Sequence, residues 1–273
     1  VVGIKVDKGA QSLALNSREK VTEGLDGLRD RLAKYHERGA RFAKWRAVVD
    51  IDNQLPTYGA LKSNVHALAR YAALCQEAGI VPIVEPEVVM DTPGANHSIE
   101  RCYEVTDGAL KLLYNELRDA GVDLEGTILK PNMVVPGKDG TSASVEQVAE
   151  QTVRVLKANV PSMVPGIAFL SGGQSDEQAT AHLSAMNAMF DLPWKLTFSY
   201  GRALQAAALQ TWGGKSENVA AAQRAFEHRA RMNGLAATGG WKETLEKAAY
   251  PSRNTDFEKT SVFRGLFAFG LRF

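Results

Sequence analysis

Short apolar runs alternate along the chain with longer stretches in which apolar residues recur every three or four positions. Six runs have the length and composition of buried strands: 3–7, 45–51, 80–86, 126–131, 166–172 and 195–201. The stretches with helical spacing cover 21–39, 59–79, 98–121, 142–160, 175–191 and 202–212. Continuous apolar strands separated by crossover helices predict a parallel sheet covered on both faces.

Two architectures fit this alternation, an open doubly wound sheet and a (β/α)8 TIM barrel. No Gly-x-Gly-x-x-Gly segment follows the first run and no phosphate-binding Gly-x-x-x-x-Gly-Lys-Ser/Thr loop occurs, which disfavours a nucleotide-binding sheet. Polar residues stand instead at the expected strand ends, where barrel enzymes gather their chemistry. We therefore predict an α/β barrel with only about six of its eight βα units present, as a single domain over 1–273 with a C-terminal tail from about 250 to 273.

Composition narrows the setting of this domain. With 45% hydrophobic and 23% charged residues and a net charge of +1, the chain resembles an ordinary globular protein and predicts neither a nucleic-acid nor a membrane partner. Two cysteines, Cys75 and Cys102, cannot form a disulfide framework, so a reducing, cytoplasmic location is expected. The five histidines lack the spacing of metal ligands, and no metal site is predicted.

The polar residues at the expected strand ends form the candidate site. Singly, each reads as a solvated loop residue, a turn or a helix cap, but a barrel would bring them together at one mouth. They are Asp7, Lys8, Lys44, Arg46, Glu85, Glu87, Lys130, Ser171, Gly172, Gly173, Ser199, Gly201 and Arg202.

These residue types together suit one kind of chemistry. A lysine held near other cations and apolar walls has a lowered pKa, and its free amine can attack a ketone to form a Schiff base. A nearby glutamate can move the protons that this step requires. Backbone N–H groups of a Gly-Gly turn and a following Gly-Arg pair can hold a phosphate. The set therefore predicts carbon–carbon bond chemistry on a phosphorylated ketose or ketone.

Six segments carry a family resemblance at this point. "IKVDKG", "FAKWRAVV", "IVPIVEPEV", "ILKPNMVVPG", "FLSGGQS" and "LTFSYGRALQ" resemble, in order and spacing, the signature segments of class I fructose-1,6-bisphosphate aldolase over residues 1 to about 254. The resemblance implies reversible cleavage of fructose 1,6-bisphosphate to dihydroxyacetone phosphate and glyceraldehyde 3-phosphate, a step of glycolysis and gluconeogenesis. It also implies a homotetramer that needs no metal or cofactor.

The resemblance assigns catalytic roles to four residues. Lys130 matches the lysine that forms the Schiff base with the C2 carbonyl, and Glu85 matches the glutamate that handles protons during imine formation. Glu87 matches a second active-site glutamate. Lys44 matches the lysine whose charge keeps the neighbouring amine unprotonated.

Substrate binding is implied for the remaining positions. Lys8 and Arg46 match residues along the sugar-phosphate path, with Arg46 placed for the phosphate remote from the imine. The segments that match the site of the C1 phosphate contain Ser171, Gly172, Gly173, Ser199, Gly201 and Arg202.

The sequence departs from the family pattern in two places. The family carries an aspartate in a first-strand segment reading like "ADES", which is absent here, and no tyrosine follows Tyr250, although family tails commonly end in a functional one. We expect the N-terminal part of the barrel to be missing, and residues 1–273 alone to be unstable with little or no lyase activity. Ordinary rates of fructose 1,6-bisphosphate cleavage by the purified chain would contradict this expectation.

Two other interpretations stay open. Another Schiff-base barrel, such as a deoxyribose-phosphate aldolase or a transaldolase, would lack the combined "VEPE", "LKPNM" and "SGGQS" segments. A non-catalytic scaffold, or an inactive fragment of an aldolase barrel, is the alternative outside the enzymes.

Overall fold

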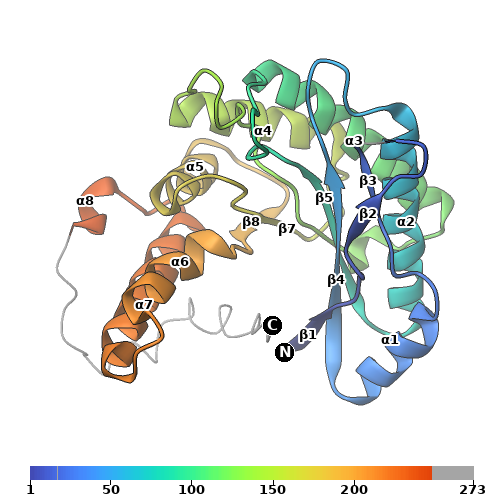
Figure 1. Ribbon diagram of the computed structural model, residues 1–273, viewed down its shortest axis with the longest axis horizontal. Coiled ribbons are helices and arrows are strands. Elements are labelled where there is room, and N and C mark those ends of the chain that lie inside the picture. The colour runs from blue at the N-terminus through green and yellow to red at the C-terminus, as the bar shows by residue number, and fades with distance from the viewer. Residues whose placement is uncertain (17, 248–273) are drawn as a thin grey trace.

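The computed structural model describes residues 1–16 and 18–247, so the predicted tail at 250–273 lies outside the described residues. Each of the six predicted runs overlaps a strand (Figure 1). The strands are β1 (Val2–Lys5), β4 (Ala40–Val49), β5 (Val81–Val88), β6 (Ile128–Leu129), β7 (Gly166–Phe169) and β8 (Lys195–Phe198). They form one parallel sheet in the order β1-β4-β5-β6-β7-β8.

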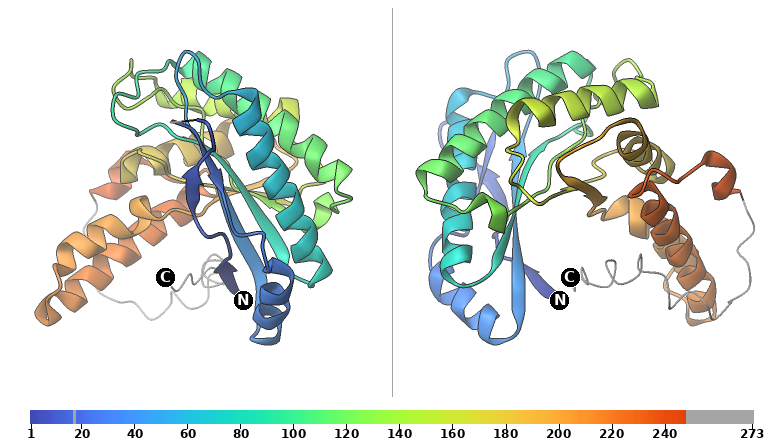
Figure 2. Two further views of the ribbon diagram at one scale, coloured as in Figure 1. Left: turned by 45° about the vertical axis from the view of Figure 1, so that its right-hand side comes forward. Right: turned by 180° about the vertical axis from the view of Figure 1, so that it is seen from behind.

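The strand order decides between the two predicted architectures. Spatial order follows sequence order without the reversal that defines a doubly wound sheet, so successive right-handed crossovers place their helices on the same side. Helices α2 and α3 accordingly lie together on the outer side of β4 and β5 (Figures 1 and 2). The fold is thus α/β of the barrel type, and the barrel is not closed, since β1 pairs with β4 and β8 with β7 alone.

The helices follow the predicted stretches closely. They are α1 (Leu28–Glu37), α2 (Tyr58–Glu77), α3 (Ile99–Asp119), α4 (Val145–Asn159), α5 (Asp176–Met189), α6 (Arg202–Trp212), α7 (Val219–Ala236) and α8 (Glu243–Glu246), with short 3-10 turns at Leu124–Gly126 and Ser216–Asn218. Serine and threonine hydroxyls cap α2 to α5, and Ser144 and Ser175 form capping boxes with Gln147 and Gln178. Helices α7 and α8 lie outside the predicted stretches.

The helix expected over 21–39 is partly wrong. Its first residues form a short strand, β3 (Lys20–Thr22), which pairs antiparallel with β2 (Ala10–Ser12). Positive φ angles at Gly24 (130°) and Gly27 (66°) interrupt the backbone before α1 begins. The side chain of Asn64 on α2 accepts a hydrogen bond from the N–H of Thr22, so a tertiary contact stabilises the strand.

The positions expected at the ends of the second and third strands lie inside β4 and β5. β4 begins at Ala40 rather than near 45, and its buried positions Ala43, Trp45, Ala47 and Val49 alternate with less buried ones. Because side chains of a strand alternate between faces, Lys44 and Arg46 lie on the face opposite the helices. Glu85 and Glu87 likewise lie within β5. The alternating apolar residues of β4 face the helices, and the charged residues between them face the other side of the sheet.

A buried tyrosine joins the helix layer to the two longest strands. The Tyr71 side chain of α2 is fully buried against Trp45, with ring centroids 5.6 Å apart. Its hydroxyl donates to the carbonyl of Ala43 on β4 at 2.6 Å and accepts from the N–H of Ile83 on β5 at 3.2 Å. One side chain therefore helps to hold the β4–β5 register that positions the candidate site.

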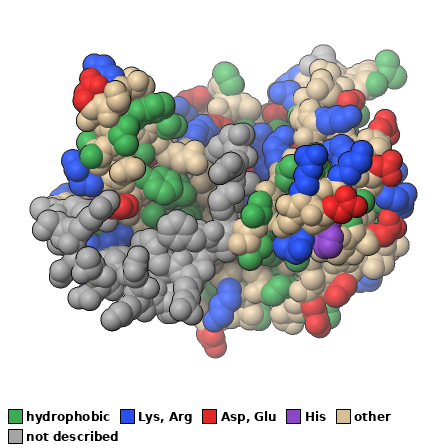
Figure 3. Space-filling view, turned by 90° about the horizontal axis from the view of Figure 1, so that it is seen from below, with side chains coloured by type: hydrophobic (Ala, Val, Ile, Leu, Met, Phe, Trp, Pro, Cys, Tyr) green, Lys and Arg blue, Asp and Glu red, His purple; other side chains and the backbone are tan. Residues whose placement is uncertain are grey.

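The surface is of mixed charge. Acidic and basic side chains lie intermixed over the face seen from below (Figure 3). None of the described helices is both long enough and apolar enough to cross a membrane.

Replacing Tyr71 with phenylalanine should lower the free energy of unfolding by about 1–3 kcal/mol, because it removes the buried hydrogen bonds of the hydroxyl to the backbones of two strands. Urea denaturation followed by circular dichroism measures this as a lower midpoint. The matched change Tyr58→Phe, at an exposed tyrosine of the same helix, should shift stability by no more than about 0.5 kcal/mol. Equal effects of the two changes would contradict the proposed role of the hydroxyl.

Candidate functional site

The β4–β5–β6 register gathers charged side chains on the inner face of the sheet. Arg46 is opposite Glu85 in the β4–β5 ladder, so their side chains share one face with Lys44 and Glu87. The ladder continues one residue past β6, where the N–H of Lys130 donates to the carbonyl of Val84 at 2.8 Å. Lys130 therefore lies beside Glu85 at the carboxyl end of its strand, as predicted.

Lys44, Glu85 and Lys130 form a lysine–glutamate cluster. The Lys130 Nζ lies 3.0 Å from Glu85 Oε1, and the Lys44 Nζ lies 2.8 Å from Glu85 Oε2. The side chains of Lys130, Glu85 and Lys44 are 9%, 3% and 13% exposed. Two ammonium groups thus share one carboxylate in a site largely removed from water.

Burial has the largest effect on Lys130 and lowers its pKa from the ordinary lysine value. The charge of Glu85 acts in the opposite direction, whereas the charge of Lys44 lowers the pKa further. Because Lys44 occupies the second oxygen of the carboxylate, Glu85 does not fully offset the burial of Lys130. The arrangement favours the free amine, the form of lysine that attacks carbonyl carbons.

Two further ion pairs lie on the neighbouring strands. Arg46 Nε donates to Glu87 Oε2, and Lys5 Nζ lies 2.6 Å from Asp7 Oδ1. Asp7 is buried and also accepts hydrogen bonds from the N–H groups of Gly9 and Arg46. Arg46 and Glu87 thus lie next to the cluster, where the sequence predicts them.

Lys5 is the residue that sequence reasoning missed on this face. It is opposite Lys44 in the β1–β4 ladder and so shares its side of the sheet. Strand alternation was the signal, because Lys5 lies between Ile4 and Val6 and so points to the opposite face from them, and only the fold shows that this face is the inner one. Lys8 lies beyond β1 with an exposed side chain, and it makes no ion pair within residues 1–16 and 18–247.

The segments after β7 and β8 form a second part of the site. Ser171, Gly172 and Gly173 make a turn, here called the Gly-Gly turn, in which Gly172 has a φ of 57°. A Cβ on Gly173 would approach the Asp91 Cβ to 2.5 Å, so the turn tolerates no side chain there. Steric constraints therefore explain why glycine occupies both positions.

The start of α6 lies against this turn. Gly201 is its N-cap residue and, having no side chain, does not cap the first N–H groups of the helix. The guanidinium of Arg202 donates from Nη2 to the carbonyl of Gly172 at 2.7 Å and pairs with Asp91 Oδ2 at 2.7 Å. The N-terminus of α6 and the Gly-Gly turn are thus held together by Arg202.

Several N–H groups in this part of the site are free to bind a ligand. Within the described residues, the N–H groups of Gly172, Gly173 and Arg202 donate to no protein acceptor. Ser199 follows β8, and its N–H donates to the carbonyl of Phe169 at 2.8 Å. Free N–H groups at a helix start beside a guanidinium form an anion-binding arrangement.

The two parts of the site are adjacent in the sheet. The N–H of Leu170, just before the Gly-Gly turn, donates to the carbonyl of Pro131, just after Lys130, at 3.1 Å. The N–H of Val88 on β5 donates to Asn132 Oδ1 at 3.1 Å. The segments that follow β5, β6 and β7 are therefore joined directly, with the amine and the anion-binding turn on successive strands.

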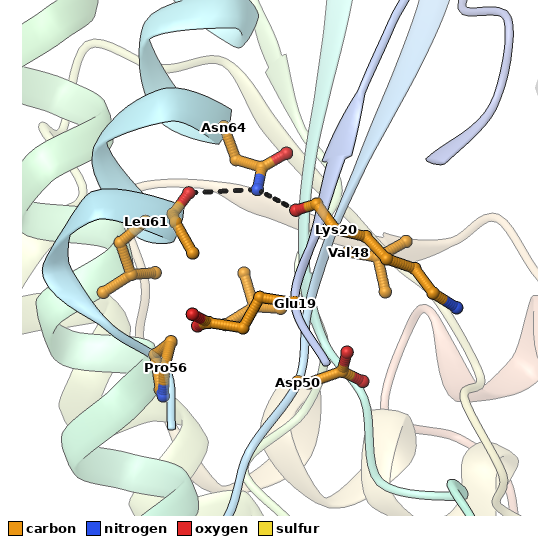
Figure 4. Close-up of a pocket in the computed structure, with 9 residues that line it drawn as sticks. Glu19, Lys20, Val48, Asp50, Pro56, Leu61 and Asn64 are labelled. Carbon is orange, nitrogen blue, oxygen red and sulfur yellow. Dashed lines mark hydrogen bonds between the residues drawn. The ribbon is translucent and has the colours of Figure 1, made fainter. Parts of the chain in front are cut away.

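A small hollow between β3, β4 and α2 is a weaker candidate (Figure 4). Its carboxylate Glu19 accepts hydrogen bonds from the Thr57 N–H at 2.7 Å and the Thr57 hydroxyl at 2.6 Å, and Asn16 donates a third at 2.6 Å. Asn64 donates to the carbonyls of Lys20 and Ala60. These polar groups are already engaged in joining the β2–β3 hairpin to α2. No cluster of potential metal ligands occurs within residues 1–16 and 18–247.

A parallel sheet of barrel type with a buried lysine and an anion-binding turn at the carboxyl ends of its strands is typical of barrel enzymes. The model of the family "Fructose-bisphosphate aldolase class-I" matches residues 1–262. The chain belongs to this family, whose members are carbon–carbon lyases, and the resemblance noted in the sequence is confirmed.

Individual relatives agree with the family match. A Xylella fastidiosa protein described as "Probable fructose-bisphosphate aldolase class 1" is 58% identical over 89% of this chain and 72% of its own length. Fructose-bisphosphate aldolase B of Bos taurus is 53% identical over 88% of this chain and 65% of its own length. A solved fructose-bisphosphate aldolase from Plasmodium falciparum superposes with a TM-score of 0.84 at 49% identity, covering 88% of this chain and 69% of that one.

The charges around Lys130 predict that two substitutions shift its pKa in opposite directions. Lys44→Gln removes a like charge and should raise the pKa of Lys130, whereas Glu85→Gln removes an opposite charge and should lower it. A change of about one pKa unit alters the fraction of free amine roughly tenfold below the pKa. The pH dependence of reductive methylation at Lys130, followed by mass spectrometry, reports the midpoint.

Lys34→Gln is the control for this measurement, because Lys34 lies exposed on α1 away from the cluster. It should leave the Lys130 midpoint in place. Shifts of the same sign in Lys44→Gln and Glu85→Gln would show that general disruption, rather than charge, controls the amine.

Proposed function

We propose that this chain supplies the Schiff-base lysine, Lys130, for the reversible aldol cleavage of fructose 1,6-bisphosphate to dihydroxyacetone phosphate and glyceraldehyde 3-phosphate. The observation that carries the proposal is the buried Lys130 amine, 3.0 Å from Glu85 and sharing that carboxylate with Lys44. Family membership supports the reaction class, and the anion-binding turn on the next strand supports a phosphorylated substrate.

Imine formation uses the three residues of the cluster. The free amine of Lys130 attacks the C2 ketone, and the new carbon–nitrogen bond converts the carbonyl oxygen to a hydroxyl. Glu85 first accepts the proton that the Lys130 ammonium loses on becoming the free amine. It then passes this proton to the hydroxyl, which leaves as water, and the iminium remains on Lys130. Lys44 keeps the amine free before attack and balances the charge of Glu85 during the proton transfers.

The iminium then accepts the electron pair of the C3–C4 bond. During cleavage a carboxylate takes the proton of the C4 hydroxyl, the aldehyde half leaves, and an enamine remains on Lys130. The enamine is protonated at C3, and the resulting iminium is hydrolysed to free the ketone half. Glu87, held by Arg46 beside Glu85, supplies a second carboxylate next to the reacting carbons.

Phosphate binding is assigned to both sides of the amine. The free N–H groups of Gly172 and Gly173, the start of α6 and Arg202 would bind the C1 phosphate, with Ser171 and Ser199 beside them. Arg46, 42% exposed at its side chain, would meet the remote phosphate, with Lys8 further along the same path. The chemistry so described needs no metal or cofactor.

The oligomeric state and the location are further parts of the proposal. A homotetramer in the cytoplasm agrees with the family, whose relatives include a cytosolic aldolase of Arabidopsis thaliana that is 54% identical. Large apolar side chains on the paired helices α6 and α7 are exposed and available for subunit contact, among them Leu209, Trp212 and Phe226.

Borohydride trapping tests the proposal. Incubation with dihydroxyacetone phosphate followed by reduction should add one three-carbon phosphate adduct, and peptide mass spectrometry should locate it on Lys130. The variant Lys130→Met should lose the adduct entirely, Lys62→Met should retain it, and EDTA should leave trapping unchanged. A folded chain that forms no adduct favours the scaffold interpretation, and an adduct on another lysine would overturn the assignment.

A further inference from the structure

Gln174 holds the Gly-Gly turn in its observed shape. Its backbone N–H donates to the carbonyl of Ser171 at 3.2 Å, and its side-chain Nε2 donates to the same carbonyl at 2.9 Å. Nε2 also lies 3.8 Å from the sulfur of Met133, in the segment that follows Lys130. The amide group of Gln174 is therefore one direct link between the turn and the segment that follows Lys130, besides the hydrogen bond of Leu170 to Pro131.

The orientation of this amide depends on His182. His182 Nδ1 lies 2.5 Å from Gln174 Oε1. If the amide were reversed, Oε1 would face the Ser171 carbonyl and the Met133 sulfur, which are both acceptors. The observed orientation requires Oε1 to accept from Nδ1, so His182 carries its proton on Nδ1.

His182 is placed to make this contact rigid. It lies on α5, is 6% exposed, and its helix begins directly after the turn with the Ser175–Gln178 capping box. Burial lowers the pKa of His182 to about 4, with the charge of Glu146 on α4 opposing the shift. The ring is thus neutral near pH 7, with one proton to donate and one nitrogen free of it.

We propose that His182 is a positioning residue for phosphate binding, which orients Gln174 so that the N–H groups of Gly172 and Gly173 point at the ligand. With the Ser171 carbonyl held by two donors, the turn keeps its amides away from protein acceptors, as observed within the described residues. The identity of the ligand as the phosphate of a ketone substrate rests on the proposed function above.

A set of matched variants separates this role from packing. His182→Asn retains an N–H donor near the position of Nδ1, His182→Leu has a similar branched shape without a donor, and Gln174→Met removes the amide while keeping its length. Each is compared by borohydride trapping at Lys130 as a function of ketone concentration. Dihydroxyacetone phosphate and unphosphorylated dihydroxyacetone are titrated in parallel.

His182→Leu and Gln174→Met should each raise the half-saturating concentration of dihydroxyacetone phosphate about tenfold, the effect of one lost buried hydrogen bond. The maximal extent of trapping and the titration with dihydroxyacetone should stay unchanged. His182→Asn should lie within about twofold of the unaltered chain, and the double variant should be no weaker than either single one.

Two results of the titrations would overturn the proposal. One is a His182→Leu chain that binds both ketones like the unaltered chain. The other is an equal loss for both ketones, which would indicate a structural role without preference for phosphate.

If the unaltered chain traps no ketone at all, the proposed function fails. The role of His182 can still be tested then by a measurement that does not involve a ketone. Nitrogen-15 NMR of the histidine rings at pH 7 should show His182 neutral with its proton on Nδ1. The variant His182→Leu should accelerate hydrogen exchange at the side-chain amide of Gln174. A proton on Nε2, or exchange that does not change, would overturn the role of His182.

Discussion

One carboxylate between two ammonium groups is the interaction on which the site depends. Glu85 lies within ion-pair distance of both Lys44 and Lys130, and each of its two carboxylate oxygens pairs with one of them. Lys130 therefore shares its carboxylate partner with a second cation, in a place where its burial already disfavours the charged form. Burial therefore still lowers the pKa of Lys130, and the same contact places a carboxylate beside its amine.

This arrangement in turn depends on strand register. Lys44, Glu85 and Lys130 come from three strands, and a shift of one residue in any of them would turn its side chain toward the helix layer. The register is held from the outside, where Trp45 and Tyr71 pack and the Tyr71 hydroxyl bonds to the backbones of β4 and β5. The apolar outer face thus determines the geometry of the charged inner face.

The anion-binding part uses backbone groups rather than side-chain charge. Gly172 and Gly173 supply free N–H groups because one adopts a positive φ and the other admits no Cβ, and Gln174 with His182 holds the turn behind them. Arg202 alone adds a full positive charge, and Asp91 partly balances it. The turn therefore combines shape with moderate charge.

The sequence by itself determined the alternation of strands and helices, because hydrophobic periodicity and capping residues act over a few neighbouring positions. It also marked the candidate segments of the site, since "LKPNM", "VEPE" and "SGGQS" have unusual composition for strand ends. It misplaced Lys44, Arg46, Glu85 and Glu87 at strand ends because a charged inner face interrupts the apolar run that marks a strand.

Only the tertiary structure decided which groups meet. The pairing of Glu85 with two lysines, the position of Lys5 beside Lys44, the β2–β3 hairpin and the contact of His182 with Gln174 all join residues from different elements of the fold. Such contacts depend on register, crossover direction and burial, which no local pattern encodes. The lowered pKa of Lys130 belongs to this second group, because burial within the folded sheet is its largest cause.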